Sequence, residues 1–96
     1  IGMTLITIDG YEVAEEQAER FLRDRERVAA ALETLLLDRY ARVCRMTLEP
    51  EDGYGLAAYN AQGKLAFHFP LDPGNVARAA EALAADRLAD FLADCL

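Results

Sequence analysis

Three short segments of alternating hydrophobicity lie in the middle of the chain, and they constrain the fold more than any other feature. The alternating segments are residues 40–48, 54–59 and 64–69, and turns at residues 49–53 and 60–63 join them. The second turn ends at Gly63, a residue type that accepts the positive φ such turns need. Alternating segments joined by tight turns are typical of antiparallel strands. The pattern therefore predicts a three-stranded antiparallel meander.

The two turns also predict which residues face each other across the strands. The expected pairs are Leu48 with Tyr54, Met46 with Leu56, Leu56 with Phe67, and Ala58 with Leu65. Successive side chains of a strand point to opposite faces of the sheet, so this register sorts them into two sets. The apolar face, which we expect to be the core, carries Cys44, Met46, Leu48, Tyr54, Leu56, Ala58, Leu65, Phe67 and Phe69. The opposite face carries Val43, Arg45, Thr47, Gly55, Ala57, Tyr59, Lys64, Ala66 and His68.

Residues 4–8 are rich in β-branched side chains and end at Asp9-Gly10, which allows two continuations. Asp-Gly favours a hairpin turn, after which residues 11–13 return as a second strand. Alternatively, Asp9 caps a helix, with a glutamate three residues later completing a capping box. We favour the helix because its first turns are then acidic, which the positive end of the helix dipole stabilises. The acidic residues are Glu12, Glu15, Glu16 and Glu19.

Apolar residues at steps of three and four predict a long amphipathic helix over about residues 12–38. The i,i+4 ion pairs expected on its surface are Glu16 with Arg20 and Glu19 with Arg23. Arg25 stands where the next apolar residue is due, which allows two interpretations. Either its aliphatic stem lies along the edge of the packed face with the charge in water, or it is buried and pairs with a carboxylate.

Asp72 and Pro73 open a last helix, as N-cap and first helical residue. Its apolar stripe runs through Val76, Ala80, Leu83, Ala84, Leu88, Phe91 and Cys95. Together the segments predict a single α+β domain over residues 1–96. It has two layers, with the long N-terminal helix and the C-terminal helix packed on the apolar face of the antiparallel meander. Whether residues 4–8 add a fourth, edge strand to that sheet is left open.

The composition excludes several classes of function. The chain has 10 Lys and Arg against 17 Asp and Glu, a formal net charge of -7, which argues against coating nucleic acid or docking on an anionic membrane. It has no serine and a single histidine, His68, which excludes a Ser-His-Asp triad and any metal site with two His ligands. Two cysteines are too few for a disulfide scaffold, and no apolar run approaches the length of a membrane span. We expect a cytoplasmic protein.

Each candidate for chemistry has a simpler interpretation. Cys44 and His68 fall on opposite faces in the expected register, so they form no nucleophilic pair, and both Cys44 and Cys95 are expected to be buried as small hydrophobes. No cysteine or histidine spacing suits zinc, and Gly53 and Gly55 lack the Lys-Ser/Thr of a phosphate loop. The carboxylates expected in a solvated turn, rather than around a divalent ion, are Glu49, Glu51 and Asp52. We therefore expect no catalytic residue, metal or cofactor.

The sheet face opposite the expected core is the best candidate for a binding surface. Its centre is small, formed by Gly55, Ala57 and Ala66. The cationic and aromatic side chains expected around that centre are Arg45, Tyr59, Lys64 and His68. Arg and Tyr are enriched in protein interfaces, and local positive charge attracts an acidic partner or a small anion.

These observations predict a non-enzymatic protein–protein interaction module. We expect it to be a homodimer, to bind itself or another protein, and to use this sheet face or the long first helix. The alternative is a domain that binds a small molecule or anion through Arg45, Tyr59 and His68. An enzyme that relies on His68 or a carboxylate is the least favoured hypothesis, because a small domain with one histidine has little room for a preorganised pocket.

Overall fold

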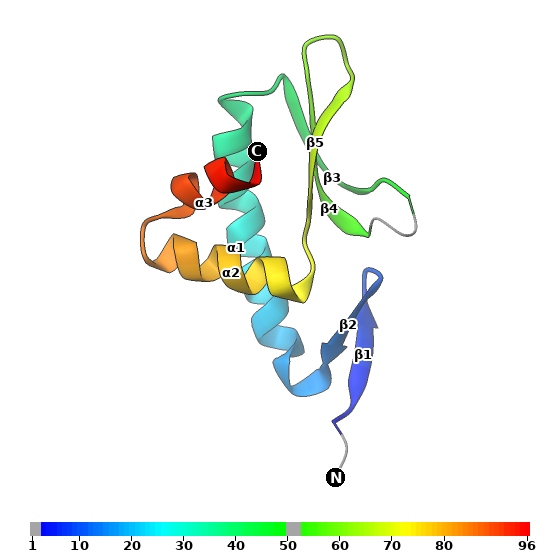
Figure 1. The fold of residues 1–96 in the computed structure, drawn as a ribbon. Coiled ribbons are helices and arrows are strands. Elements are labelled where there is room, and N and C mark those ends of the chain that lie inside the picture. The colour runs from blue at the N-terminus through cyan, green and yellow to red at the C-terminus, as the bar shows by residue number, and fades with distance from the viewer. Residues whose placement is uncertain (1–2, 50–52) are drawn as a thin grey trace.

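The computed structural model describes residues 3–49 and 53–96, which form an α+β fold with two antiparallel sheets (Figure 1). In chain order the elements are β1 (Leu5–Ile8), β2 (Tyr11–Ala14), the short 3-10 helix η1 (Glu15–Gln17), α1 (Ala18–Leu37), β3 (Arg42–Thr47), β4 (Tyr54–Tyr59), β5 (Leu65–Pro70), α2 (Pro73–Ala84) and α3 (Leu88–Cys95). Strands β3, β4 and β5 form the meander, and β1 and β2 form a separate sheet. The predicted α+β class, with its antiparallel meander and long N-terminal helix, is confirmed.

The first two strands form a hairpin whose turn is Asp9-Gly10. The φ angles are 48° at Asp9 and 91° at Gly10, and a two-residue type I′ turn requires a positive φ at both positions. The favoured prediction, a helix that is capped by Asp9 and begins near residue 12, is therefore wrong. The β-branched residues of β1 pair with β2, and α1 begins only at Ala18. The N-terminal strand consequently adds no fourth strand to the meander in the part of the chain that the structure describes.

Side chains at its turn and along its inner face attach the hairpin to the rest of the fold. The Tyr11 hydroxyl donates a hydrogen bond of 2.9 Å to the carbonyl oxygen of Tyr54. The Arg25 guanidinium donates one of 2.6 Å to the Asp9 carboxylate, and its carbon lies 4.8 Å from the centre of the Tyr54 ring. Only 17% of the Arg25 side chain is exposed. Of the two interpretations of Arg25, the largely buried arginine that pairs with a carboxylate is the correct one.

The register of the meander differs from the prediction on both sides of β4. On the β3 side, Arg45 lies opposite Leu56, where the prediction puts Met46. On the β5 side, Phe69 lies opposite Leu56, where the prediction puts Phe67, and a β-bulge follows near the end of β4. Because side chains alternate, a shift of one residue exchanges the two faces of a strand, whereas a shift of two keeps them.

The predicted faces are therefore right for the centres of β4 and β5 and wrong for β3. Phe69 faces the same side as Leu56, as expected. Cys44 and Met46, which the prediction assigns to the core, lie on the opposite side of the sheet. Arg45 shares the side of Leu56, because two carboxylates of α1 hold its guanidinium there. Long-range ion pairing thus overrides the hydrophobic alternation of β3.

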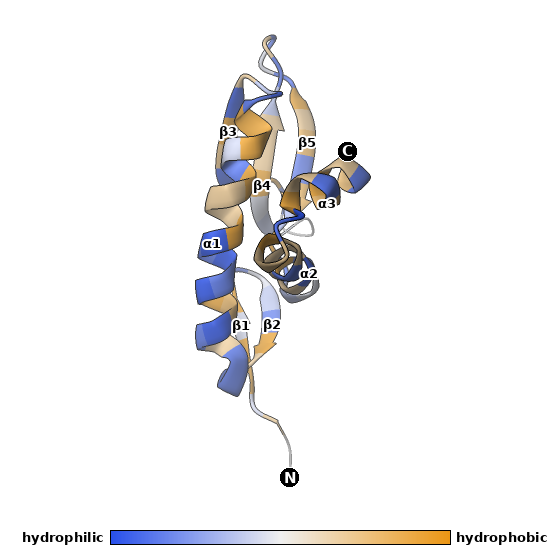
Figure 2. Cartoon of the chain, turned by 90° about the vertical axis from the view of Figure 1, so that its left-hand side faces the viewer, coloured by the Kyte–Doolittle hydropathy of each residue, from blue (hydrophilic) through white to orange (hydrophobic). Residues whose placement is uncertain are grey.

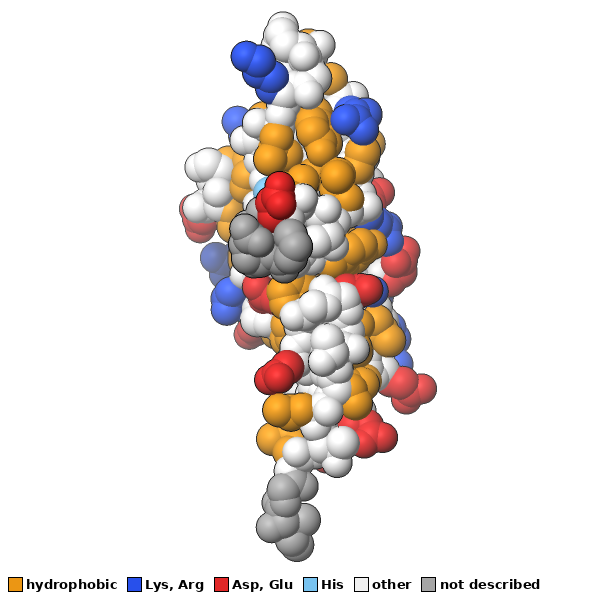
Figure 3. Space-filling model, turned by 90° about the vertical axis from the view of Figure 1, so that its right-hand side faces the viewer, with side chains coloured by type: hydrophobic (Ala, Val, Ile, Leu, Met, Phe, Trp, Pro, Cys, Tyr) orange, Lys and Arg blue, Asp and Glu red, His pale blue; other side chains and the backbone are white. Residues whose placement is uncertain are grey.

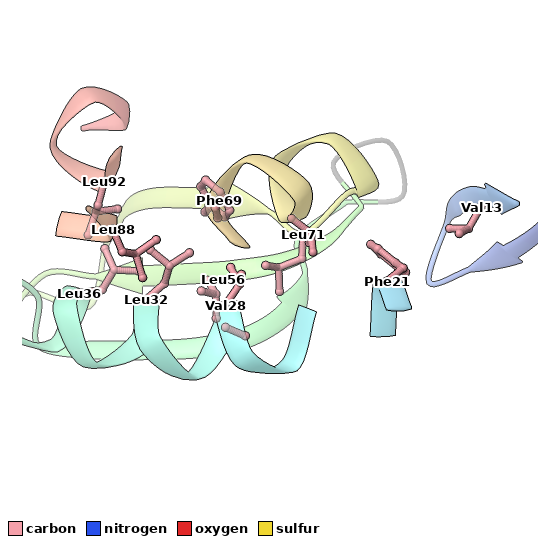
Figure 4. Packing of buried hydrophobic residues seen from close by; sticks show 13 residues of the cluster. Val13, Phe21, Val28, Leu32, Leu36, Leu56, Phe69, Leu71, Leu88 and Leu92 are labelled. Atoms are coloured by element: carbon pink, nitrogen blue, oxygen red, sulfur yellow. The ribbon is translucent and has the colours of Figure 1, made fainter. Parts of the chain in front are cut away.

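The core lies between the meander and the helices, which cover one face of the sheet (Figures 1 and 2). Its buried residues, some of them labelled in Figure 4, are Val13, Phe21, Val28, Ala29, Leu32, Leu36, Leu56, Phe69, Leu71, Val76, Ala79, Leu88 and Leu92. Two leucines assigned to the core by the sequence lie elsewhere. Leu48 follows the end of β3, and Leu65 is 48% exposed at the start of β5.

The predicted last helix is two helices, α2 and α3. Its start is as predicted, with Asp72 as N-cap accepting a hydrogen bond of 2.7 Å from the Asn75 backbone N–H. The break occurs at Asp86, whose φ is 57°, and the Arg87 N–H bonds to the Ala82 carbonyl at 2.7 Å, as in a Schellman motif. The apolar stripe continues past this break, so periodicity does not reveal it. Cys95 ends α3 and is exposed, so the prediction that it is buried is wrong.

Candidate functional site

Two of the four predicted binding residues lie on one face of the meander, and two do not. Tyr59 and His68 lie on the face away from the helices, as expected. Arg45 lies on the helix-covered face, so it shares no site with them. Lys64 is exposed in the turn between β4 and β5, where its backbone exchanges hydrogen bonds with Asn60. The group that the sequence predicts is therefore not assembled.

The face of the meander away from the helices is here called the open sheet face. It carries Arg42, Cys44 and Met46 from β3, Gly55, Ala57 and Tyr59 from β4, and His68 and Pro70 from β5. Figure 3 views the molecule from this side, and hydrophobic side chains gather over the meander with charged ones around them. Solvent-facing sides of antiparallel sheets are normally polar. This one is mostly apolar, and Arg42 is its one residue with a permanent charge.

Arg42 takes the place on this face that the sequence assigned to Arg45. Its guanidinium carbon lies 4.2 Å from the centre of the Tyr59 ring, and Nη1 donates a hydrogen bond of 3.0 Å to Cys44 Sγ. The Tyr59 hydroxyl in turn donates to Met46 Sδ at 3.2 Å. Cation–π and sulfur contacts therefore hold these side chains flat against the sheet. Arg42 forms no ion pair with a carboxylate among the described residues. Sequence periodicity assigns Arg45 to this face, and only the one-residue shift of β3 in the structure brings Arg42 there instead.

The centre of the open sheet face is closed by side chains rather than hollow. A Cβ atom at Gly55 would lie 2.8 Å from His68 Nε2, so the imidazole covers this glycine. Ala57 is completely buried, between Cys44 on one neighbouring strand and His68 on the other. The prediction that Cys44 and His68 lie on opposite faces is therefore wrong. Strand β4 separates them, and the hydrogen-bond partner of the Cys44 thiol is Arg42.

Arg45 joins β3 to α1 on the other face of the sheet. Its Nε donates to Glu33, and its Nη1 donates to Glu26 Oε2 at 2.6 Å. Hydrogen bonding to Arg45, reinforced by its positive charge, lowers the pKa of Glu26 below the ordinary carboxyl value. The hydrogen bonds that Arg45 donates to the two glutamates raise its own pKa. The arrangement links β3 to α1.

We expect this link to make the protein less stable in acid. The pKa of Glu26 is lower in the folded state than its ordinary value of 4.5, so its contribution is present above that value and is lost as the pH falls through the folded-state pKa. Arg45→Met should therefore reduce the loss of unfolding free energy between neutral pH and acid. Urea unfolding followed by circular dichroism measures it. The control is Arg39→Met, and equal acid losses in the two variants would contradict the assignment.

The remaining candidate features of the described residues are metal ligands, the acidic turn and membrane-spanning helices. In residues 3–49 and 53–96, no three His, Cys, Asp or Glu side chains are grouped so that they could hold a metal ion. Glu49 is exposed, while Glu51 and Asp52 lie outside the described residues. No described helix combines the length and apolarity needed to cross a membrane. Comparison with known proteins finds no family, no curated protein and no solved structure that matches this chain.

Proposed function

We propose that this protein is a non-enzymatic protein–protein interaction module that forms a homodimer through the open sheet face. One observation carries the proposal: the chain's own helices cover one side of the meander and leave a mostly apolar side uncovered. Sheets with one apolar face are stable when that face is packed against another layer. A second copy of the same face supplies such a layer, because an interface around a two-fold axis pairs one surface with itself.

The dimensions of the chain support the same proposal. Its accessible surface is 6132 Å², against about 5,500 Å² for a compact monomer of this mass. Its radius of gyration is 13.9 Å, against about 12.5 Å for a compact domain of this length. The larger surface accompanies an elongated shape, with extents of 51 × 32 × 18 Å. A single chain of this shape therefore exposes more surface than a compact monomer, and a partner can cover part of it.

The residue types of the open sheet face suit an interface core. Tyr, Met and Arg are enriched where protein interfaces are most buried. Tyr59 and Met46 contact each other at 3.2 Å, so they are already ordered and lose little side-chain entropy when a second copy covers them. Arg42 lies against the Tyr59 ring and keeps its charge accessible at the edge. Two such faces stack with about 10 Å between the sheets.

We also propose that the protein is located in a reducing compartment such as the cytoplasm. Both cysteines are free thiols, and Cys95 is exposed. An oxidising compartment would favour disulfides between chains at such a position.

Light scattering on a size-exclusion column tests the dimer at low and at high salt. We expect a dimer whose mass is unchanged by salt, since apolar contacts form it, and a monomer for Met46→Glu, which places a charge in the interface. The matched control is Thr47→Glu, because Thr47 is the next residue of β3, is exposed and points to the other side of the sheet.

Two outcomes would overturn the proposed interface. One is a monomeric wild-type chain at micromolar concentration. The other is a dimer that survives Met46→Glu but is lost in Leu22→Glu. Leu22 is 41% exposed on α1. Loss of the dimer there would move the interface to the long first helix.

A further inference from the structure

A concave surface, here called the notch, lies where the N-terminal half of α1 meets α2. Buried apolar side chains form its floor: Phe21 and Val28 from α1, and Val76 from α2. Its α2 wall includes three alanines, among them the exposed Ala77. Its volume is about 750 Å³ and it is open to solvent along its length, so it has room for several side chains of a partner. The notch shares no residue with the open sheet face.

The α1 wall of the notch carries three arginines and one carboxylate, Asp24. Arg20, Arg23 and Arg27 follow each other at steps of three and four, which places them on one side of the helix. Arg20 reaches the carboxylate of Asp24 only at 3.8 Å, and 80% of its side chain is exposed. Arg23 and Arg27 form no ion pair within residues 3–49 and 53–96. In a chain with a net charge of -7, this leaves a row of weakly paired cations beside an apolar floor.

The late start of α1 explains why Arg20 lacks its predicted partner Glu16, whereas Glu19 and Arg23 both lie within α1 and form no ion pair there. The sequence predicts i,i+4 ion pairs of Arg20 with Glu16 and of Arg23 with Glu19, and neither pair forms. Glu16 lies in η1, before the first turn of α1, so helical i,i+4 geometry does not apply to it. The arginine charges are therefore available to a partner.

We propose that the notch binds an amphipathic, acidic helix of a partner protein. The floor is made by two helices, and a third helix that packs along them buries its apolar stripe there. Carboxylates on the flank of that helix beside α1 pair with Arg23 and Arg27. Glu81 lines the opposite wall, on α2, and accepts a basic residue on the other flank. The partner therefore carries acid on one side of its apolar stripe and tolerates a base on the other.

A peptide titration tests the proposal with the chain of residues 1–96. The probe is a fluorescein-labelled helical peptide of about 18 residues, long enough to hold a helix, with leucines at steps of three and four and glutamates on one flank. Its counterpart has lysine in place of every glutamate. We expect the acidic peptide to bind roughly tenfold more tightly in fluorescence anisotropy, from two partly exposed ion pairs and the repulsion of the lysines.

Matched variants separate the notch from the overall charge of the chain. Arg23→Glu with Arg27→Glu should weaken the acidic peptide about tenfold and favour the basic one. Arg39→Glu with Arg87→Glu changes the net charge equally and should have little effect, because both arginines lie outside the notch. Ala77→Trp fills the notch from an exposed position and should abolish binding without removing a charge.

Several results would overturn the proposal. The first is absence of binding at about 100 μM peptide, a concentration at which even weak complexes are detected. The second is equal binding of the acidic and the basic peptide. The third is equal weakening of the acidic peptide by the two double variants. Competition by a single-stranded oligonucleotide as strong as that by the acidic peptide would also overturn it, by assigning the arginines to polyanions in general. Met46→Glu should bind the peptide normally, so failure of the dimer and failure of the notch can be told apart.

Discussion

Phe69→Ala is expected to lower the free energy of unfolding by about 3–5 kcal/mol, the usual cost of truncating a buried phenylalanine. Phe69 is 4% exposed and lies opposite Leu56 in the centre of the meander. Its ring meets that of Phe91 on α3 edge to face, with centres 6.0 Å apart and planes at 78°. The truncation removes contacts that join the sheet to the C-terminal helices and leaves a cavity between them. Urea unfolding followed by circular dichroism measures the loss.

Leu65→Ala is the matched control for this experiment. Leu65 lies in the same strand but is 48% exposed, so its truncation should change the free energy of unfolding by no more than about 0.5 kcal/mol. The comparison tests the register of β5 directly. Similar losses for the two variants would show that Phe69 does not face the helices.

Gly55→Ala is expected to destabilise the protein by about 1–3 kcal/mol or more, as overpacking of a closed site does. A Cβ atom at this position would lie 2.3 Å from the backbone carbonyl oxygen of Phe69 and 2.8 Å from His68 Nε2. The imidazole can rotate away, but the carbonyl belongs to the neighbouring strand. Relief of that contact requires β4 and β5 to separate locally, which weakens the hydrogen bonds between them. Thermal unfolding followed by circular dichroism is a direct measure.

Gly74→Ala provides the opposite case in the same chain. Gly74 lies in the first turn of α2, where a Cβ atom would come no closer than 3.4 Å to the mobile guanidinium of Arg78. Alanine is the better helix former, so this change should be neutral or stabilise the protein by up to about 1 kcal/mol. If the two substitutions shifted the melting temperature equally, the close approach of β4 and β5 at Gly55 would be refuted.

Local signals in the sequence were sufficient for the features that local chemistry determines. The Asp72 cap followed by Pro73 located the start of α2, and its side-chain hydrogen bond confirms it. The alternation in β5 placed Phe69 on the covered face although the predicted partner was two residues away. An even shift preserves the face, so alternation alone was enough there.

The orientation of β3 depends on residues far away in the chain. Cys44 and Met46 are apolar and alternate, so a sequence pattern assigns them to the core. The structure instead turns Arg45 to the covered face, because Glu26 and Glu33, 19 and 12 residues before it, bind its guanidinium. Hydrophobic periodicity contains no information on such pairing. The same shift replaces Arg45 by Arg42 on the open sheet face.

Backbone geometry at single residues explains the two helix boundaries that were missed. Asp9-Gly10 suits both a hairpin turn and a helix cap, and pairing of β1 with β2 decides between them. At Asp86, one residue with positive φ ends α2 while the apolar stripe continues. Aspartate tolerates a positive φ better than most residues, but the presence of an aspartate alone does not predict one. The first of these boundaries also affects the notch, because the late start of α1 leaves Arg20 without its predicted partner Glu16.

Because of the contacts of the β1–β2 hairpin, a partner bound in the notch would also affect the hairpin. A two-stranded hairpin is marginally stable by itself, so β1 and β2 stay ordered through the contacts of Asp9, Tyr11 and Val13 with the rest of the fold. Val13 also lines the notch beside Phe21. An occupant that rests on Val13 therefore binds only the docked form of the hairpin and shifts the population toward it. The proposed occupancy of the notch is therefore linked thermodynamically to docking of the β1–β2 hairpin.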